Sequence, residues 1–342
     1  MHKNNLSTGR LLFIVLVIVF FWVAVNHLNE TKEIFSVLIE GKWYWVTLAV
    51  LCQLIFYPFY ARFVEFVFNI FKVDFKYNKI LPIYIASKFT DIVLPIATVG
   101  KIAIFVRNGK KNDITPINIG IGMAFTQIID LIAFVSLSLI IIYFLYLFGE
   151  PRTYLLITSL ILAVIVISFT ALVVATSKSN KPFTNTFKWI AKKVARIAGQ
   201  KRIDFDEVRS IFNEVAKDLD AGGKKIWPAF GIGVCTHLIN IITLGLIYLA
   251  FSPNFNILAV LATYIAGLLF TVISITPQGV GVAETIMVTT LHSFGMDLSV
   301  SAVITMAYRG LLYWLPLFPG FYFFSHLEFK TPERSLPVIP ST

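Results

Sequence analysis

The chain has 342 residues, of which 57% are hydrophobic and 14% are charged, and its mean hydropathy is +0.79. This composition excludes an ordinary soluble domain and indicates an integral membrane protein. The net charge of +10 is expected to lie mainly against anionic lipids of the inner leaflet. Nucleic acid is not an expected partner, because the basic residues flank apolar runs and do not form a reader domain.

Seven apolar runs are long enough to cross a ~30 Å hydrocarbon core, which takes roughly 20 residues. The first follows Lys3 and Arg10, as in a signal peptide. No small-residue cleavage site follows it, so we expect it to be retained as a span. In chain order the runs are Leu11–Leu28, Trp43–Tyr60, Ile117–Phe148, Tyr154–Val174, Trp227–Phe251, Ile257–Ile275 and Val300–Phe324.

Two similar stretches break this apolar pattern with proline, glycine and charge. Tyr84 to Lys101 reads YIASKFTDIVLPIATVGK, and Tyr264 to Glu284 reads YIAGLLFTVISITPQGVGVAE. Each begins Tyr-Ile-Ala, reaches a proline eleven or thirteen residues later and continues to glycine and a charged residue. Broken backbone at membrane depth is tolerated only where protein buries it or water surrounds it. A matched pair of breaks therefore predicts a transporter-like binding site.

The positions of lysine and arginine predict the orientation. There are four lysines and arginines in Arg62–Lys79, three in Arg107–Lys111 and twelve in Ser177–Lys225. There are none in Ser252–Asn256 or Gly295–Ser299. We therefore expect a multi-pass protein of the inner (cell) membrane with both termini in the cytoplasm.

This orientation places the two broken segments on opposite sides of the membrane. Ile80–Val106 has basic connections at both ends, and its arms of about a dozen residues rise only ~18 Å each, so it should enter and leave from the cytoplasmic face. Ile257–His292 should enter from the other face, although Ile257–Ile275 is long enough to span completely. The expected fold class is an all-α polytopic membrane protein with about six full transmembrane helices and two re-entrant broken-helix hairpins in inverted repeats.

The predicted organisation is a single transmembrane domain at residues 1–325, with one repeat at about 43–148 and the other at about 227–325. Residues 177–225 are expected to form a cytoplasmic loop of two amphipathic helices on the inner leaflet, and residues 326–342 a short tail.

Within this loop, Asp204 to Asp206 and Asp218 to Asp220 match the Asp-x-Asp pattern with which nucleotide-sugar transferases hold a divalent cation. Both matches fall on solvated helix faces, so we expect no metal there. Cys52 and Cys235 lie within apolar runs and indicate neither a disulfide nor a metal site.

Ionisable side chains at membrane depth cost roughly 2.5–3.5 kcal/mol each and are candidates for function by default. Structural alternatives remain open for each of them. Lys88 and Asp91 could neutralise each other on one helical face, and Lys101 could extend to the inner headgroups, as could Arg107. The candidates are Lys88, Asp91, Lys101, Asp130, Glu284 and Arg309.

Polar contacts between helices are the alternative for the remaining groups. Asp130 could pair with Gln127, and Arg309 with Glu284. The preferred interpretation of His237 and Asn240 is likewise hydrogen bonding between helices. Asp130 and Arg309 follow Pro95 and Pro277 at comparable distances, so they could face one another across the repeat interface.

The glycines after Pro277 predict an anion site. Gly279 and Gly281 permit positive φ or close backbone approach. Amides opening the next half-helix, near Val282–Thr285, would then point into the site. With Arg309 nearby, the expected ligand is a phosphate-bearing headgroup.

The sequence shows no recognisable nucleophile and base, no phosphate-binding Walker loop and no metal-ligand cluster. The chain is therefore expected to need no cofactor, and the balance is against an enzyme without deciding the question.

The motif PQGVGVAETIMVTTLHSFG followed by MAYRGLLYWLPLFPG resembles the transmembrane region of the lysylphosphatidylglycerol synthase family, also called the flippase-like domain family. The resemblance covers roughly Leu11 to Phe324. The residues that carry it are Pro277, Gly279, Gly281, Glu284, Arg309, Tyr313, Trp314, Pro319 and Gly320.

The first repeat departs from the family pattern, which has Pro-x-Arg-x-Gly-Glu where this chain has a threonine in place of the arginine and a lysine in place of the glutamate. The positions that carry over are Pro95, Gly100, Arg107 and Asp130. The family's soluble aminoacyltransferase domain would need a few hundred residues after the last span, so lysyl transfer is not expected.

The resemblance and the broken segments together imply a protein that binds and translocates a lipid or lipid-linked intermediate between leaflets. The alternative is a membrane-embedded transferase, or an accessory subunit, that acts on a lipid-phosphate acceptor. Expected partners are the anionic headgroup, inner-leaflet lipids and either a second copy or an envelope-biosynthesis protein. The predicted substrate-binding residues are Pro277, Gly279, Gly281, Glu284, Arg309, Asp130, Lys101 and Arg107.

Overall fold

A computed structural model of the chain describes residues 36–70, 72–93, 97–110, 114–150, 153–178, 223–274 and 276–327. Within these ranges the regular structure is entirely helical, which confirms the predicted all-α fold class. The predicted span Leu11–Leu28, the Asp-x-Asp matches of the large loop and Pro95 lie outside the described residues.

Helix lengths follow the same order, long, short, short, long, in both halves of the chain. The first half consists of α3 (Trp43–Ile70), α4 (Tyr77–Val93), α5 (Ala97–Lys110) and α6 (Pro116–Leu147), with 28, 17, 14 and 32 residues. The second consists of α10 (Ile226–Phe251), α11 (Ile257–Ile273) and α12 (Val282–Ser293), with 26, 17 and 12 residues. Its fourth stretch has 29 residues and consists of α13 (Leu298–Trp314) and α14 (Leu317–His326). Helix α7 (Thr153–Lys178) joins the halves.

Among the described residues, four helical stretches are long and apolar enough to cross a membrane: α3, α6, α10, and α13 with α14. Helix α7, with 26 residues, covers the predicted run Tyr154–Val174. Helix α11 has 17 residues, a rise of ~25 Å, and packs along α12. The helical part of the predicted run Ile257–Ile275 is therefore shorter than a ~30 Å core.

Helix α3 continues ten residues beyond the predicted end of its apolar run at Tyr60. Its charged residues are compatible with the helix because they are paired. The Nη1 atom of Arg62 lies 2.7 Å from Glu65 Oε2, and Glu65 Oε1 accepts a hydrogen bond from the Tyr77 amide. The buried side chains of Phe63, Val64 and Val67 on the same turns anchor it to the core.

Local sequence signals explain where other helices begin. The Thr115 side chain caps α6 by accepting a hydrogen bond from the Asn118 amide, and Pro116 occupies the first helical position. Asn256 caps α11 by accepting from the amides of Leu258 and Ala259.

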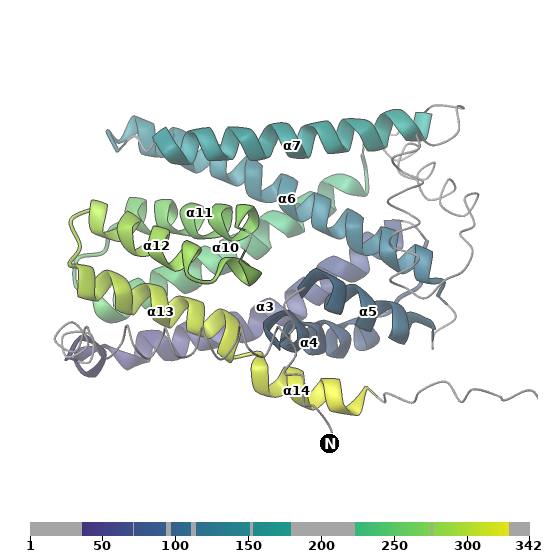
Figure 1. The fold of residues 1–342 in the computed structure, drawn as a ribbon, viewed down its shortest axis with the longest axis horizontal. Helices are drawn as coiled ribbons and strands as arrows, with labels where there is room; N and C mark the ends of the chain where they lie inside the picture. Colours follow the sequence, from purple (N-terminus) through teal and green to yellow (C-terminus); the bar gives the residue numbers. More distant parts are fainter. Residues whose placement is uncertain are drawn as a thin grey trace, which may run out of the picture.

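The two hairpins occupy opposite ends of the bundle along the direction of the long helices (Figure 1). Helices α11 and α12 lie at the left of that view and α4 and α5 at the right, and α10 packs against α3 and α6 of the first half as well as α11 and α13 of the second. One apolar core centres on α3 to α6, and another on α10 to α13 with α6 and α7.

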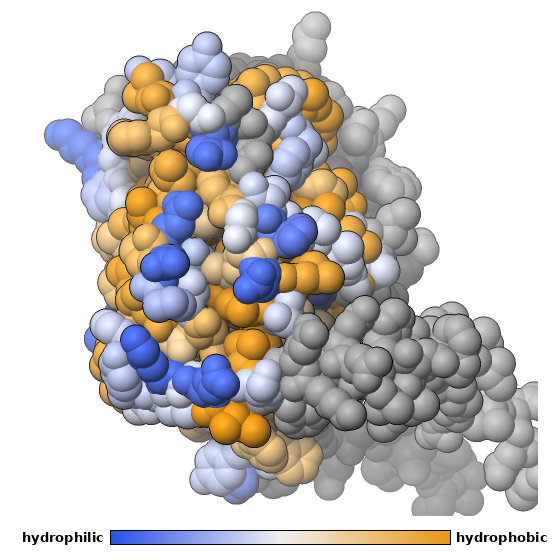
Figure 2. Space-filling model, turned by 90° about the vertical axis from the view of Figure 1, so that its left-hand side faces the viewer, coloured by the Kyte–Doolittle hydropathy of each residue, from blue (hydrophilic) through white to orange (hydrophobic). Residues whose placement is uncertain are grey.

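The outer surface of the bundle is strongly apolar. Large side chains of α7 such as Ile157, Val164 and Ile167 are 52%, 63% and 65% exposed. The end of the bundle at the left of Figure 1 carries polar side chains scattered among apolar ones (Figure 2). Lipid-facing sides with more polar ends are what a membrane protein requires.

Candidate functional site

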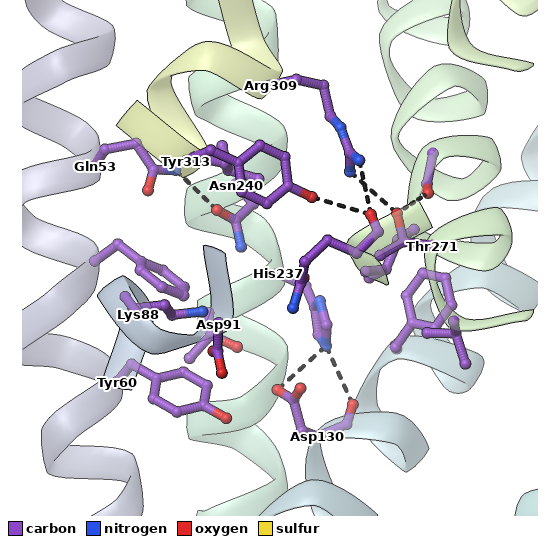
Figure 3. A pocket seen from close by; sticks show the side chains of 18 of the residues that line it. Gln53, Tyr60, Lys88, Asp91, Asp130, His237, Asn240, Thr271, Arg309 and Tyr313 are labelled. Atoms are coloured by element: carbon purple, nitrogen blue, oxygen red, sulfur yellow. Dashed lines mark hydrogen bonds and ion pairs between the residues drawn. The ribbon is translucent and has the colours of Figure 1, made fainter. Parts of the chain in front are cut away.

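A cavity of about 320 Å³ lies between the two hairpins (Figure 3). The α3, α6 and α10 residues that line it, among them Tyr57, Asp130 and His237, come from the middle turns of those helices. Helices α4, α5, α11, α12 and α13 and the short turn η1 (Pro277–Gly279) contribute the rest. Both halves of the chain therefore build one site near the middle of the bundle.

Tyrosines form much of the wall on the side of the first hairpin. The rings of Tyr60 and Tyr84 are stacked, with centroids 4.6 Å apart and an interplanar angle of 16°. The Nζ atom of Lys88 lies 5.3 Å from the Tyr84 ring centroid, and that of Lys101 lies 5.5 Å from the Tyr60 centroid and 5.6 Å from that of Tyr84. All three distances suit cation–π contacts.

The Lys88, Asp91 and Lys101 side chains line the cavity, and their ammonium and carboxylate groups make no hydrogen bond or ion pair with any residue that the structure describes. The Oδ1 atom of Asp91 is buried without a hydrogen-bond partner. The direct pairing of Lys88 with Asp91 that their spacing allowed is therefore absent from the described contacts.

In the second half, the charge of the hairpin, Glu284, is paired with an arginine of the next helix, α13. Arg309 is only 6% exposed, and its Nε donates to Glu284 Oε1 at 2.7 Å. Its Nη1 donates to the Thr271 hydroxyl at 3.1 Å and its Nη2 to the Gln278 carbonyl at 2.8 Å. The Tyr313 hydroxyl donates to the same carbonyl at 3.1 Å. Arg309 thus links α13 to α11, η1 and α12. Of the alternatives that the sequence left open for Arg309, the structure shows the pair with Glu284.

The turn that Arg309 holds has an unusual backbone. Gln278 has φ 55° and ψ 18°, and Gly279 has φ 68°. A Cβ atom at Gly279 would lie 2.7 Å from the Thr271 Cα, so only glycine fits there.

Asp130 and His237 form a third polar group in the cavity. The Nε2 atom of His237 lies 3.1 Å from the Asp130 carbonyl oxygen and 3.6 Å from its carboxylate, and Nδ1 lies 2.7 Å from the Tyr264 hydroxyl. Nearby, Gln53 donates to Asn240 at 2.8 Å. The interpretation of His237 and Asn240 as hydrogen-bonding partners between helices is confirmed, and both also line the cavity.

Comparison with known proteins places this architecture in a family. The family described as the lysylphosphatidylglycerol synthase TM region matches residues 10–320. The chain belongs to this family. A relative named UPF0104 membrane protein MJ1595, from Methanocaldococcus jannaschii, is 24% identical over 331 residues, which are 94% of this chain and 95% of the relative. No solved structure matches.

Some residues of the family's motif line the cavity, and others hold the turn beside it in place. Arg309 lines the cavity, whereas Gly279, Gly281 and Glu284 are not among its lining residues. The Glu284 carboxylate instead accepts a hydrogen bond from the Gly281 amide at 2.7 Å, and Gly281 is exposed. The start of α12, where the glycines predicted an anion site, is therefore not part of the cavity lining, and the amide of its N-cap residue already donates to a carboxylate of the same helix.

Of the other predicted substrate-binding residues, two line the cavity and two do not. Asp130 and Lys101 line the cavity together with Arg309 (Figure 3 shows Asp130 and Arg309). Arg107 is half-buried on α5 outside the lining and is engaged elsewhere. Pro277 belongs to η1.

The sequence analysis did not single out three of the lining residues on α3, namely Gln53, Tyr57 and Tyr60. Tyr57 and Tyr60 lie one turn apart on α3, a spacing equally typical of an ordinary apolar face, so nothing local distinguished them.

Proposed function

We propose that this membrane protein binds the headgroup of a phospholipid or lipid-linked intermediate in the cavity and translocates it between leaflets. The acyl chains stay in the bilayer, against the apolar exterior. The observation that carries the proposal is one charged cavity at mid-helix depth, lined by two hairpins from opposite ends of the bundle. Ionisable groups at such a depth are costly, and those that the protein does not pair are candidates for contact with a ligand.

The matched halves supply a physical route for alternating access. In this proposal α4 and α5 enter the membrane from the cytoplasmic face and α11 and α12 from the other, so that the halves form inverted repeats. Rocking one half against the other would open the cavity to each face in turn. The lysines of the first hairpin then hold the phosphate as the headgroup crosses.

The proposal is tested with purified protein in phosphatidylcholine vesicles that contain tail-labelled phospholipids. A membrane-impermeant quencher reports how much label reaches the outer leaflet. The double variant Lys88→Gln, Lys101→Gln should move lipid at least about 10-fold more slowly than the wild type, since each lysine offers a charge-assisted bond to phosphate. Lys224→Gln, which changes an exposed lysine outside the cavity, is the control. Equal rates for wild type, double variant and protein-free vesicles would contradict translocation.

A further inference from the structure

The charged residues of the cavity differ in whether the protein already satisfies them. Arg309 has Glu284 as its counter-ion and two further acceptors. Asp130 lies beside His237. In contrast, Lys88, Asp91 and Lys101 have no hydrogen bond or ion pair within the described part of the chain. The unmet groups all belong to the first hairpin.

All three side chains are half-buried, and the Oδ1 atom of Asp91 is fully buried without a hydrogen-bond partner. Because polar groups withdrawn from water are unfavourable without a partner, these groups are suited to binding a ligand. The stacked rings of Tyr60 and Tyr84 attract the two ammonium groups but accept no conventional hydrogen bond from them. The N–H donors of both lysines stay available to acceptors in the cavity. The Asp91 carboxylate is available to a donor.

The formal charges around the cavity cancel. Lys88, Lys101 and Arg309 balance Asp91, Asp130 and the Glu284 that neutralises Arg309. A ligand with a net charge would leave one of these groups uncompensated in a medium of low dielectric constant. A ligand that is neutral overall but carries separated charges would compensate both signs.

Building on the proposed function, we propose that the cavity selects a zwitterionic headgroup made of a phosphate and a protonated amine. The ammonium groups of Lys88 and Lys101 bind the phosphate oxygens, and the carboxylate of Asp91 accepts hydrogen bonds from the amine. The second hairpin acts as the scaffold, because Arg309 is engaged in holding its turn.

Binding competition tests this selectivity separately from transport. Detergent-solubilised protein is incubated with equimolar phosphatidylethanolamine and phosphatidylglycerol, and native mass spectrometry measures the ratio of the two bound lipids. The first lipid carries a phosphate and an amine, and the second a phosphate and hydroxyls. The wild type should favour phosphatidylethanolamine about 10-fold, the discrimination expected of one charge-assisted hydrogen bond.

Asp91→Asn should bring the ratio close to one, while Asp74→Asn, which changes an exposed aspartate outside the cavity, should leave it as in the wild type. Lys88→Gln should reduce the binding of both lipids, and an unchanged unfolding temperature shows that each variant is folded. A wild-type ratio near one, or equal ratios in Asp91→Asn and Asp74→Asn, would overturn the proposal. Selective binding without faster lipid movement in vesicles would support this inference and contradict translocation.

Discussion

The ion pair between Arg309 and Glu284 should contribute much more to stability than an exposed pair of the same length. The chain contains a matched control, because the N–O distance is 2.7 Å both here and between Arg62 and Glu65. The glutamates are similarly buried, with Glu284 16% and Glu65 19% exposed, whereas Arg309 is 7% and Arg62 is 63% exposed. Burial of the arginine is therefore the main difference in exposure between the two pairs.

Arg309→Ala should lower the free energy of unfolding by about 3–5 kcal/mol, because it leaves the Glu284 carboxylate partly buried without its cation and removes two further hydrogen bonds. Glu284→Gln keeps an acceptor and should cost less, about 1–3 kcal/mol. The coupling energy from the double mutant should be about 1–3 kcal/mol. The same cycle at Arg62 and Glu65 should give about 0.2–1 kcal/mol.

These free energies can be measured by reversible unfolding in mixed micelles of a mild detergent and sodium dodecyl sulfate, followed by tryptophan fluorescence. A coupling energy for the buried pair no larger than that of the exposed pair would refute the view that Arg309 holds the turn of the second hairpin.

Three further predictions concern the turn, the cavity wall and the orientation. Gly279→Ala should destabilise the protein by about 1–3 kcal/mol in the same assay, because residue 279 has a positive φ and the new Cβ would clash with the backbone of α11. The control is Gly231→Ala, at a helical glycine with open space around it, which should change stability by less than about 1 kcal/mol. Tyr264→Phe should cost about 1–2 kcal/mol, since a ring nitrogen of the α10 histidine loses its 2.7 Å partner, and a loss below experimental error would argue against that bond. The last prediction uses single cysteines introduced on either side of α10 in a variant without native cysteines. An impermeant thiol reagent should label Lys224→Cys from the cytoplasmic side and Asn254→Cys from the opposite side. Labelling of both from one side would exclude the proposed orientation.

Much of the fold could be predicted because its signals are local. The ends of α6 and α10 each fall within one residue of the predicted apolar runs, since hydrophobic length and a capping threonine or a flanking charge act within one helix. The extension of α3 could not be predicted in this way. Part of its support comes from tertiary contacts, which are the burial of Phe63, Val64 and Val67 in the core and the hydrogen bond from the Tyr77 amide to Glu65 across the following connection.

For the site, the sequence by itself identified the two broken segments and the short set of ionisable residues at membrane depth, because proline, glycine and charge are conspicuous in apolar runs. Only the tertiary structure decided which of those charges are satisfied. Arg309 is paired because α12 brings Glu284 against α13, and Gln53 meets Asn240 across 187 positions of chain. Lys88, Asp91 and Lys101 instead face a shared cavity. The physical reason is that pairing depends on which helix faces pack together, and residue spacing within one helix does not determine that.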